Sequence, residues 1–263
     1  MFTFYLGVHR PNWLGELDVP LFVSRTTLSA LKHKYPRASA RWALDSGGFT
    51  ELHRHGKWTV TPAEYVAEVR RYSQEIGMME WAAPQDWMVE PRARRKTGFT
   101  TIEHQQATCA NFVELRALAP DLPIIPVIQG WKAQDYLRHV EIYDQLWGVD
   151  LFAEPLVGVG SVCRREGGWS FMNVASVLRS LAKRGLRMHG FGLSKAALHS
   201  LCGSLASSDS MAWSASGRDR SRRGGESNLQ NSPEYALGWR MGLLNDLAQK
   251  GGLHQEGCEV AFR

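Results

Sequence analysis

The segment ARWALDSGGF, residues 40–49, decides the fold because it joins an apolar run to a polar turn that contains glycine. Its first part is almost continuously apolar, which is typical of a parallel strand covered on both faces. The run then ends in Asp45, followed by Ser46, Gly47 and Gly48. We predict a strand over residues 40–46. Seven further short runs of this kind are also predicted as strands: 2–8, 20–24, 81–86, 124–129, 156–161, 187–192 and 205–210.

Longer segments with helical patterns lie between these runs. Helices are predicted at residues 62–78, about 100–118, 132–147, 171–184 and 233–249. Pro62 directly after Thr61 marks the start of the first, an N-cap residue followed by proline. Eight strands that alternate with helices predict an α/β protein, a (β/α)8 TIM barrel that forms one domain over residues 1–263. A doubly wound open sheet is the alternative, since the pattern fits both.

One stretch breaks this alternation. Residues 214–232, SASGRDRSRRGGESNLQNS, are polar, basic and interrupted by glycine. Such a composition is typical of a loop. We therefore expect a mobile loop here, between the eighth strand and a C-terminal helix at about 233–249.

Composition narrows the class of protein. The chain has 263 residues, 44% of them hydrophobic, which suits one large α/β domain. No run approaches the roughly 18 apolar residues of a membrane helix. Residues 1–13 predict a first strand and no signal peptide, so we expect a cytoplasmic protein that does not contact membranes. The four cysteines are expected to be buried thiols, since they are scattered without a CxxC pair and predict neither a disulfide framework nor a zinc ribbon: Cys109, Cys163, Cys202 and Cys258.

The charge permits a polyanionic partner. The formal net charge is +5 and the pI is near 9.1. Taken alone, each basic cluster is more typical of a solvated loop than of a phosphate-binding track. The two clusters are Arg92, Arg94, Arg95 and Lys96, and Arg218, Arg220, Arg222 and Arg223.

Polar residues gather where the predicted strands end. In a parallel barrel the active site lies at the carboxyl ends of the strands. Asp45, Asp86, Gln129 and Asp209 all occupy such positions. Each alone has an ordinary explanation as a cap, a turn residue or a satisfied amide. Their shared location at one end of the strands instead indicates a common site, and nearby glycines would let a planar ligand approach the backbone.

Five segments, taken in order, resemble the tRNA-guanine transglycosylase family. LDSGGF (44–49) resembles its DSGGF signature, and PVIQGW (126–131) is similar to its VQGG strand end. VGVGS (157–161) resembles the AVGE strand, and MHGFG (188–192) the MGVG strand. DSMAWSASGR (209–218) resembles the segment that begins with the nucleophilic aspartate and ends in SGR. The short, cysteine-poor form looks most similar to the deazapurine-in-DNA branch (DpdA-like), which acts on DNA instead of tRNA.

The sequence departs from the family pattern in two ways. The tRNA enzymes hold a structural zinc with three cysteines and a histidine after the nucleophile, whereas Cys258 alone follows Asp209 here. We therefore expect no zinc subdomain. Ser161 stands where the bacterial queuosine enzymes have the glutamate that holds an aminomethyl cation. A neutral base such as 7-cyano-7-deazaguanine is therefore the expected substrate.

The resemblance also implies a role for each site residue. Asp209 is the nucleophile that attacks C1′ of the target nucleoside, and Asp45 is the general acid/base. Asp86 accepts hydrogen bonds from N1–H and the exocyclic amine of guanine, and Gln129 donates to O6. The remaining base-binding residues are Gly158, Gly160, Gly192, Phe49, Trp87 and Ser46. The residues expected to contact phosphates are Arg218, Arg220, Arg222 and Arg223.

These residues predict a base-exchange transglycosylase that replaces guanine in a nucleic acid, DNA in preference to tRNA, with a free deazaguanine base. No metal or cofactor is expected, and accessory proteins are compatible with the sequence. Three alternatives stay open: a tRNA-guanine transglycosylase, a base-releasing glycosylase on the same barrel, and a nucleic-acid-binding subunit without catalytic activity.

Overall fold

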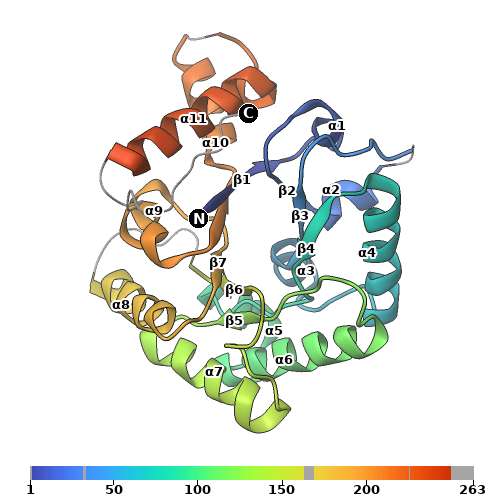
Figure 1. Cartoon of the computed structure of the whole chain (residues 1–263), viewed down its shortest axis with the longest axis vertical. Coiled ribbons are helices and arrows are strands. Elements are labelled where there is room, and N and C mark those ends of the chain that lie inside the picture. Colours follow the sequence, from blue (N-terminus) through green and yellow to red (C-terminus); the bar gives the residue numbers. More distant parts are fainter. Residues whose placement is uncertain (1, 32–33, 163–168, 225, 250–263) are drawn as a thin grey trace.

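The computed structural model describes residues 2–31, 34–162, 169–224 and 226–249 (Figure 1). All eight predicted strands are present, although most are shorter than expected. They are β1 (Thr3–Val8), β2 (Leu21–Ser24), β3 (Trp42–Asp45), β4 (Met79–Ala82), β5 (Val127–Gln129), β6 (Val157–Gly160), β7 (Met188–Gly190) and β8 (Ser207–Ser210).

The five predicted helices are confirmed. They are α4 (Pro62–Ile76), α6 (Thr101–Leu118), α7 (Ala133–Trp147), α8 (Trp169–Lys183) and α11 (Pro233–Gln249). Thr61 begins α4 as expected, because its hydroxyl accepts from the backbone N–H of Glu64 and the Glu64 carboxylate accepts from the Thr61 N–H. The sequence did not predict α1 (Trp13–Glu16), α2 (Arg25–Ser29), α3 (Gly48–His55), α5 (Pro91–Thr97), α9 (Lys195–Leu201), α10 (Ala212–Arg222) and the 3₁₀ turns η1 (Cys202–Ser204) and η2 (Leu229–Asn231).

The strands form one curled parallel sheet in the order β4-β3-β2-β1-β8-β7-β6-β5. The first and last strands of the chain are neighbours, with Tyr5 of β1 beside Asp209 of β8. Helices α4, α6, α7 and α8 lie around the outside of the curl (Figure 1). The doubly wound alternative is thereby excluded, because its sheet does not place the first strand beside the last.

The closed barrel predicted from the sequence is wrong at one place, because the sheet is open between its edge strands β4 and β5. We call this opening the seam. Among the described residues these two strands share no ladder, and a single isolated bridge joins Ala82 at the end of β4 to Ile124, three residues before β5. Proline explains the gap, because it has no backbone N–H to donate. Pro84 follows β4, while Pro123 and Pro126 precede β5. Pro84 also helps explain why β4 ends at Ala82 and not at the predicted residue 86.

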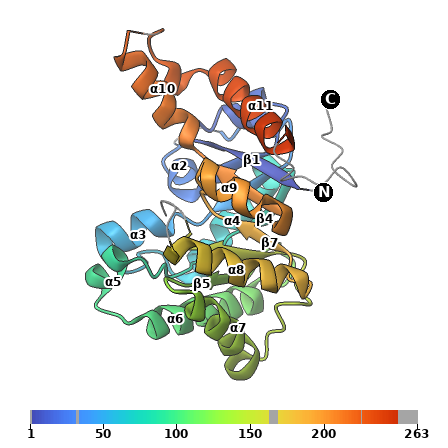
Figure 2. The ribbon, with the colours of Figure 1, turned by 90° about the vertical axis from the view of Figure 1, so that its left-hand side faces the viewer.

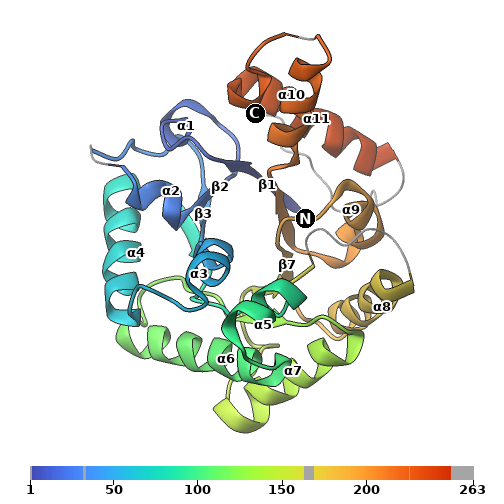
Figure 3. The same ribbon diagram turned by 180° about the vertical axis from the view of Figure 1, so that it is seen from behind.

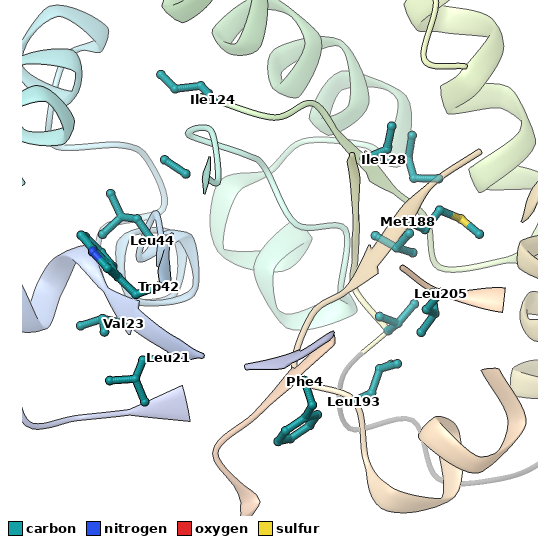
Figure 4. Packing of buried hydrophobic residues seen from close by; sticks show 14 of the residues in the cluster. Phe4, Leu21, Val23, Trp42, Leu44, Ile124, Ile128, Met188, Leu193 and Leu205 are labelled. Carbon is teal, nitrogen blue, oxygen red and sulfur yellow. The ribbon is translucent and has the colours of Figure 1, made fainter. Parts of the chain in front are cut away.

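Hydrophobic side chains fill two layers. One lies between the strands and the surrounding helices and includes Phe4, Leu21 and Trp42 (Figure 4). The other fills the inside of the curl. The residues of this inner layer are Tyr5, Phe22, Ala43, Trp81, Ala83 and Ile125. Along the strands they alternate with residues of the outer layer, because successive side chains of a strand point to opposite faces.

A buried ion pair holds the turn between β3 and α3. The guanidinium of Arg25, 4% exposed, donates to Glu51 at 2.8 Å and to Glu68 at 3.0 Å. Its Nε also donates to the backbone carbonyl of Ser46 at 3.3 Å. Gly47 completes this turn with φ +82°, a left-handed conformation that favours glycine. The LDSGGF segment is therefore held in place by contacts within the protein, without a bound ligand.

Residues 214–232 do not form the loop predicted from composition, because α10 occupies their first half. Trp213 anchors this helix: its side chain is fully buried and its Nε1 donates to the carbonyl of Gly7 at 2.7 Å. A Cβ on Gly217 would lie 2.8 Å from the backbone N of Gln230, so this glycine permits close packing of η2 instead of ending the helix. The i,i+4 contacts Ser214–Arg218 and Asp219–Arg223 support the exposed face.

Two further features bear on the class of protein. In the described part of the chain no helix is both long and apolar enough to cross a membrane. Cys109 and Cys202 are buried, as expected. Cys163 and Cys258 lie outside the described residues.

We predict that Arg25→Met lowers the free energy of unfolding by about 3–5 kcal/mol, because it leaves the buried Glu51 carboxylate without its cation. Arg71→Met is the matched control. Arg71 forms an exposed i,i+4 pair with Glu75, and its loss should change the stability much less, because exposed ion pairs contribute little. Urea denaturation of both variants measures the difference. Equal losses would show that the Arg25 ion pair does not hold the turn.

Candidate active site

The carboxyl ends of the strands surround a pocket of about 570 Å³, a volume typical of small-molecule sites. Asp45, Asp86, Gln129 and Asp209 all line it, although they come from four different strand ends. The sequence-based expectation that these side chains share one cavity is therefore met. Phe49, Gly160 and Gly192 also belong to the wall.

Asp45 lies at the end of β3, where the turn to α3 and the end of β2 supply its hydrogen bonds. Burial raises the pKa of this carboxyl, and the nearby Asp209 carboxylate raises it further. Hydrogen bonds from the Gly47 N–H and from Ser24 act in the opposite direction. The net effect is a raised pKa, which suits a group that must both donate and accept a proton.

Asp86 and Gln129 form a continuous hydrogen-bonded chain across the seam. Gln129 Nε2 donates to Asp86 Oδ2 at 2.5 Å, and the Ser46 hydroxyl donates to Asp86 Oδ1 at 3.2 Å. On the other side the Ser161 hydroxyl donates to Gln129 Oε1 at 2.8 Å and accepts from the Val89 N–H at 3.0 Å. This chain orients the Gln129 amide, so that its nitrogen faces Asp86 and its oxygen faces Ser161.

The Asp86 carboxyl has a strongly perturbed acidity. Burial, reinforced by the Asp45 carboxylate, raises its pKa to about 7, although the donors Ser46 and Gln129 oppose the shift. The protonation state of Asp86 therefore changes near neutral pH.

Asp209, on β8, is held by two donors on one oxygen. Its Oδ1 accepts from the Gly192 N–H at 2.8 Å and lies 3.2 Å from His189 Nε2. Burial lowers the pKa of His189, so its ring is neutral near pH 7. A neutral ring that accepts the Ser207 hydroxyl at Nδ1, 2.8 Å away, carries its proton on Nε2 and donates it to Asp209. These contacts fix the orientation of the carboxylate.

The glycines at the end of β6 have different roles. A Cβ on Gly160 would lie 2.2 Å from Gln129 Nε2, so this position must lack a side chain if the amide is to reach Asp86. A Cβ on Gly158 would instead lie 2.6 Å from the ring of Phe191. Gly158, which we expected at the ligand, therefore makes room for an aromatic residue of the wall and is not itself part of that wall.

The two aromatic residues expected to stack on a base occupy different places. Phe49 lines the pocket, is 41% exposed and stacks on His53 with ring centroids 4.0 Å apart. Trp87 is outside the wall and stacks on the exposed Phe99, at 5.5 Å. Its expected contact with the ligand base is therefore corrected. Ser46 is also outside the wall, behind Asp86, to which it donates.

Sequence reasoning missed several contributors. His189 lies inside the curl, 4.6 Å from the ring of Trp81 and 4.8 Å from that of Phe191. The neighbouring residues of its strand pack outward, and successive side chains of a strand point to opposite faces. This alternation was the signal that could have placed His189 inside the curl. Further wall residues come from loops for which the sequence carried no such signal, among them Met88, Glu90, Leu193 and Met211.

Helix α10 begins at the mouth of the pocket, where Ala212 and Ala215 form part of the wall. The four arginines expected to bind phosphates follow on this helix and its C-cap and are all exposed: Arg218, Arg220, Arg222 and Arg223. Figure 3 shows α10 and the helices α3 and α5 on the side of the sheet towards the viewer.

A curled parallel sheet with three carboxylates and an amide around a pocket at its carboxyl ends defines an α/β enzyme site suited to acid–base chemistry on a polar ligand. Residues 1–252 match the model of the family DpdA, described as DeoxyPurine in DNA protein A, and the chain belongs to this family. Membership implies a role in the deazapurine modification of DNA by a transglycosylase-type enzyme, with DNA as substrate. The resemblance found in the sequence is thereby confirmed. A comparison with curated proteins gave no match.

We predict that Asp86→Asn becomes more stable relative to the wild type as pH rises. The folded-state pKa of Asp86 is about 7, above that of an exposed aspartate, so ionisation destabilises the wild-type fold between about pH 4 and pH 8. The variant avoids a cost on the order of 2–4 kcal/mol. Chemical denaturation at both pH values measures this change.

Asp121→Asn is the control for this measurement. Its exposed carboxylate pairs with Arg70, which lowers its pKa, so Asp121 is ionised in the folded and the unfolded chain over nearly all of this range, and the relative stability of this variant should be almost independent of pH. An Asp86→Asn variant whose relative stability is independent of pH would mean that the residue is not a buried acid.

Proposed function

We propose that the protein exchanges guanine in DNA for a free 7-deazaguanine base through a covalent aspartyl–sugar intermediate. One observation carries the proposal: the side chains of Asp45, Asp86, Gln129 and Asp209 line a single pocket at the carboxyl ends of the strands. The family match supports DNA as the substrate. In this proposal residues 1–263 form one domain of the (β/α)8 class, with its seam between β4 and β5.

Asp209 acts as the nucleophile. The hydrogen bonds found on its carboxylate all fall on Oδ1, which leaves Oδ2 for attack on C1′. As the C1′–N9 bond of the target nucleotide breaks, its electrons leave with guanine and a C1′–O bond to Asp209 forms. The incoming deazaguanine then displaces the aspartate through its own N9. Exchange without net hydrolysis requires an intermediate of this kind.

Asp45 moves the proton. With a raised pKa it delivers a proton to the departing guanine and later takes one from the incoming base. Its electrostatic interaction with Asp209 links the two steps, because the negative charge of Asp209 favours protonation of Asp45. Formation of the glycosyl ester neutralises Asp209 and so makes Asp45 a stronger acid when guanine needs a proton.

Asp86 and Gln129 recognise the purine edge. A carboxylate offers about four lone-pair directions, of which Ser46 and Gln129 use one each. The remaining directions can accept from N1–H and the exocyclic amine of guanine. Adenine has no N1 donor and is rejected. The second hydrogen of the Gln129 amide is available to O6.

Ser161 favours a neutral 7-substituent. Its hydroxyl is engaged with Gln129 and with the backbone of Val89, and it carries no charge to offset an aminomethyl cation. We therefore propose 7-cyano-7-deazaguanine as the preferred base. Glu90 is a further carboxylate of the wall, so a direct comparison of the cyano and aminomethyl bases tests this preference.

The rest of the wall accommodates the base plane. Phe49 offers an exposed ring for stacking, and Gly192 leaves room beside the nucleophile. The target nucleotide must leave the duplex to reach Asp209, which costs a few kcal/mol. The four arginines of α10 and its C-cap, Arg218, Arg220, Arg222 and Arg223, are proposed to bind the flanking phosphates.

We predict that Asp209→Asn abolishes exchange, by at least about a thousandfold, because the amide cannot form the ester. Labelled DNA incubated without the incoming base should give a denaturation-resistant adduct with the wild type and none with the variant. Asp219→Asn, an aspartate exposed on α10, is the matched control and should form the adduct normally. An adduct with Asp209→Asn would refute the assigned nucleophile.

We predict that guanine binds more tightly as pH rises through about 7, because only the ionised Asp86 accepts both guanine donors. Below this pKa the affinity should fall about tenfold per pH unit. Equilibrium binding of labelled guanine between about pH 5.5 and pH 8.5 measures the profile. Asp86→Asn should bind weakly and without this dependence, and a variant that keeps the wild-type profile would exclude Asp86 from recognition.

A further inference from the structure

A second basic surface lies on the side of the pocket away from α10. It consists of Arg54 in α3, Lys57 just after it, and Arg92, Arg95 and Lys96 in α5. We call it the α3–α5 patch. All five side chains are exposed, and among the described residues none has a carboxylate within ion-pair distance. Five positive charges on two short neighbouring segments are therefore uncompensated.

Some other exposed arginines of this protein are paired, whereas among the described residues Arg220 and Arg222 of α10 have no carboxylate within ion-pair distance. Arg71 contacts Glu75 at 2.8 Å, Arg116 contacts Glu154 at 2.6 Å, and Arg70 pairs with Asp121. The acidic residue nearest in sequence to Arg54 is Glu51, which is buried and bound to Arg25. The cations of the α3–α5 patch thus differ from Arg70, Arg71 and Arg116, whose charges are offset by carboxylates.

The patch adjoins the mouth of the pocket. Helix α3 begins with Gly48 and Phe49, which are part of the wall, and Glu90 of the wall directly precedes α5. The ends of the two helices touch, since a Cβ on Gly56 would lie 3.0 Å from the carbonyl oxygen of Lys96. The five residues therefore belong to one continuous surface.

Helix α10 lies on the other side of the same mouth. Its first turns contribute Ala212 and Ala215 to the wall. Figure 2 shows α3, α5 and α10 on one side of the molecule, the side towards which β1 runs from the N-terminus. The opening that leads to Asp209 therefore lies between two basic surfaces, of which the arginines of α10 are one and the α3–α5 patch is the other.

We propose that the α3–α5 patch binds the DNA backbone on the side of the pocket opposite α10, so that the target strand spans the pocket mouth. This inference rests on the proposed function for its substrate. Regularly spaced phosphates are the ligand that a row of exposed, unpaired cations recognises. A nucleotide extruded into the pocket remains linked to phosphates on both its 5′ and 3′ sides. Contacts on both sides of the mouth hold those two phosphates and so position C1′ at Asp209.

The test uses Arg92→Gln/Arg95→Gln/Lys96→Gln in the full chain. Because these side chains are exposed, the variant should keep the wild-type melting temperature. Fluorescence anisotropy with a short labelled duplex containing guanine, between about 50 and 200 mM salt, gives the affinity and its salt dependence. We expect binding to weaken by about tenfold or more, and the slope of log affinity against log salt to fall by up to about three.

The matched control is Lys183→Gln/Arg184→Gln/Arg187→Gln. It removes the same charge from exposed residues before β7, at the opposite end of the strands from the pocket. It should bind DNA with nearly the wild-type salt slope. Equal loss in the two variants, or no loss in the α3–α5 variant, would overturn the proposed contact.

Measuring base exchange on the same proteins separates this inference from the proposed function. If the wild-type protein binds DNA through the patch but never incorporates labelled base, the proposed DNA contact is supported and the proposed exchange is refuted. An α3–α5 variant that binds DNA with wild-type affinity and still incorporates the labelled base would refute the patch and leave the exchange supported.

Discussion

Three carboxylates, those of Asp45, Asp86 and Asp209, share one pocket, and the rest of the site is arranged around this crowding of negative charge. Burial and repulsion by a neighbouring carboxylate both oppose the ionisation of Asp45 and Asp86. Each carboxylate therefore has its own donors, supplied by strand ends and the turns that follow them. These donors are Ser24 and Gly47 for Asp45, Ser46 and Gln129 for Asp86, and His189 and Gly192 for Asp209. The balance leaves Asp45 and Asp86 with raised pKa values.

The buried strands and the residues at their carboxyl ends could be predicted from the sequence for a single physical reason. A strand covered on both faces must be apolar, so the first polar residue after it marks the sheet edge. That rule located Asp45 and Gln129, each the last residue of its strand, although it carried no information about distances. Asp86 lies four residues beyond β4, and Asp209 lies within the polar strand β8. The sequence pattern failed for α10, because Gly217 suggests a loop until its close contact with the backbone of η2 is known.

Other features depended on partners remote in the chain. Trp87 could stack on a ligand or on Phe99, and the choice is made by the position of the segment after α5. Whether Gly158 faces a ligand is decided by Phe191, 33 residues later in the chain. The orientation of Asp209 depends on His189, 20 residues earlier in the chain. Local patterns therefore locate the strand ends, and tertiary packing decides which side chains reach the cavity.

The seam gives the sheet a property that a fully laddered cylinder lacks. Beyond the bridge of Ala82 and Ile124, the β4 and β5 edges are joined at the pocket by side chains, with Gln129 donating to Asp86. Under the proposed function, a purine would use the remaining acceptor directions of Asp86 and the second amide hydrogen of Gln129, so it would add hydrogen bonds on both sides of the seam. Occupancy of the pocket should therefore restrict local opening of these edges, and their amide protons should exchange more slowly when the pocket is filled.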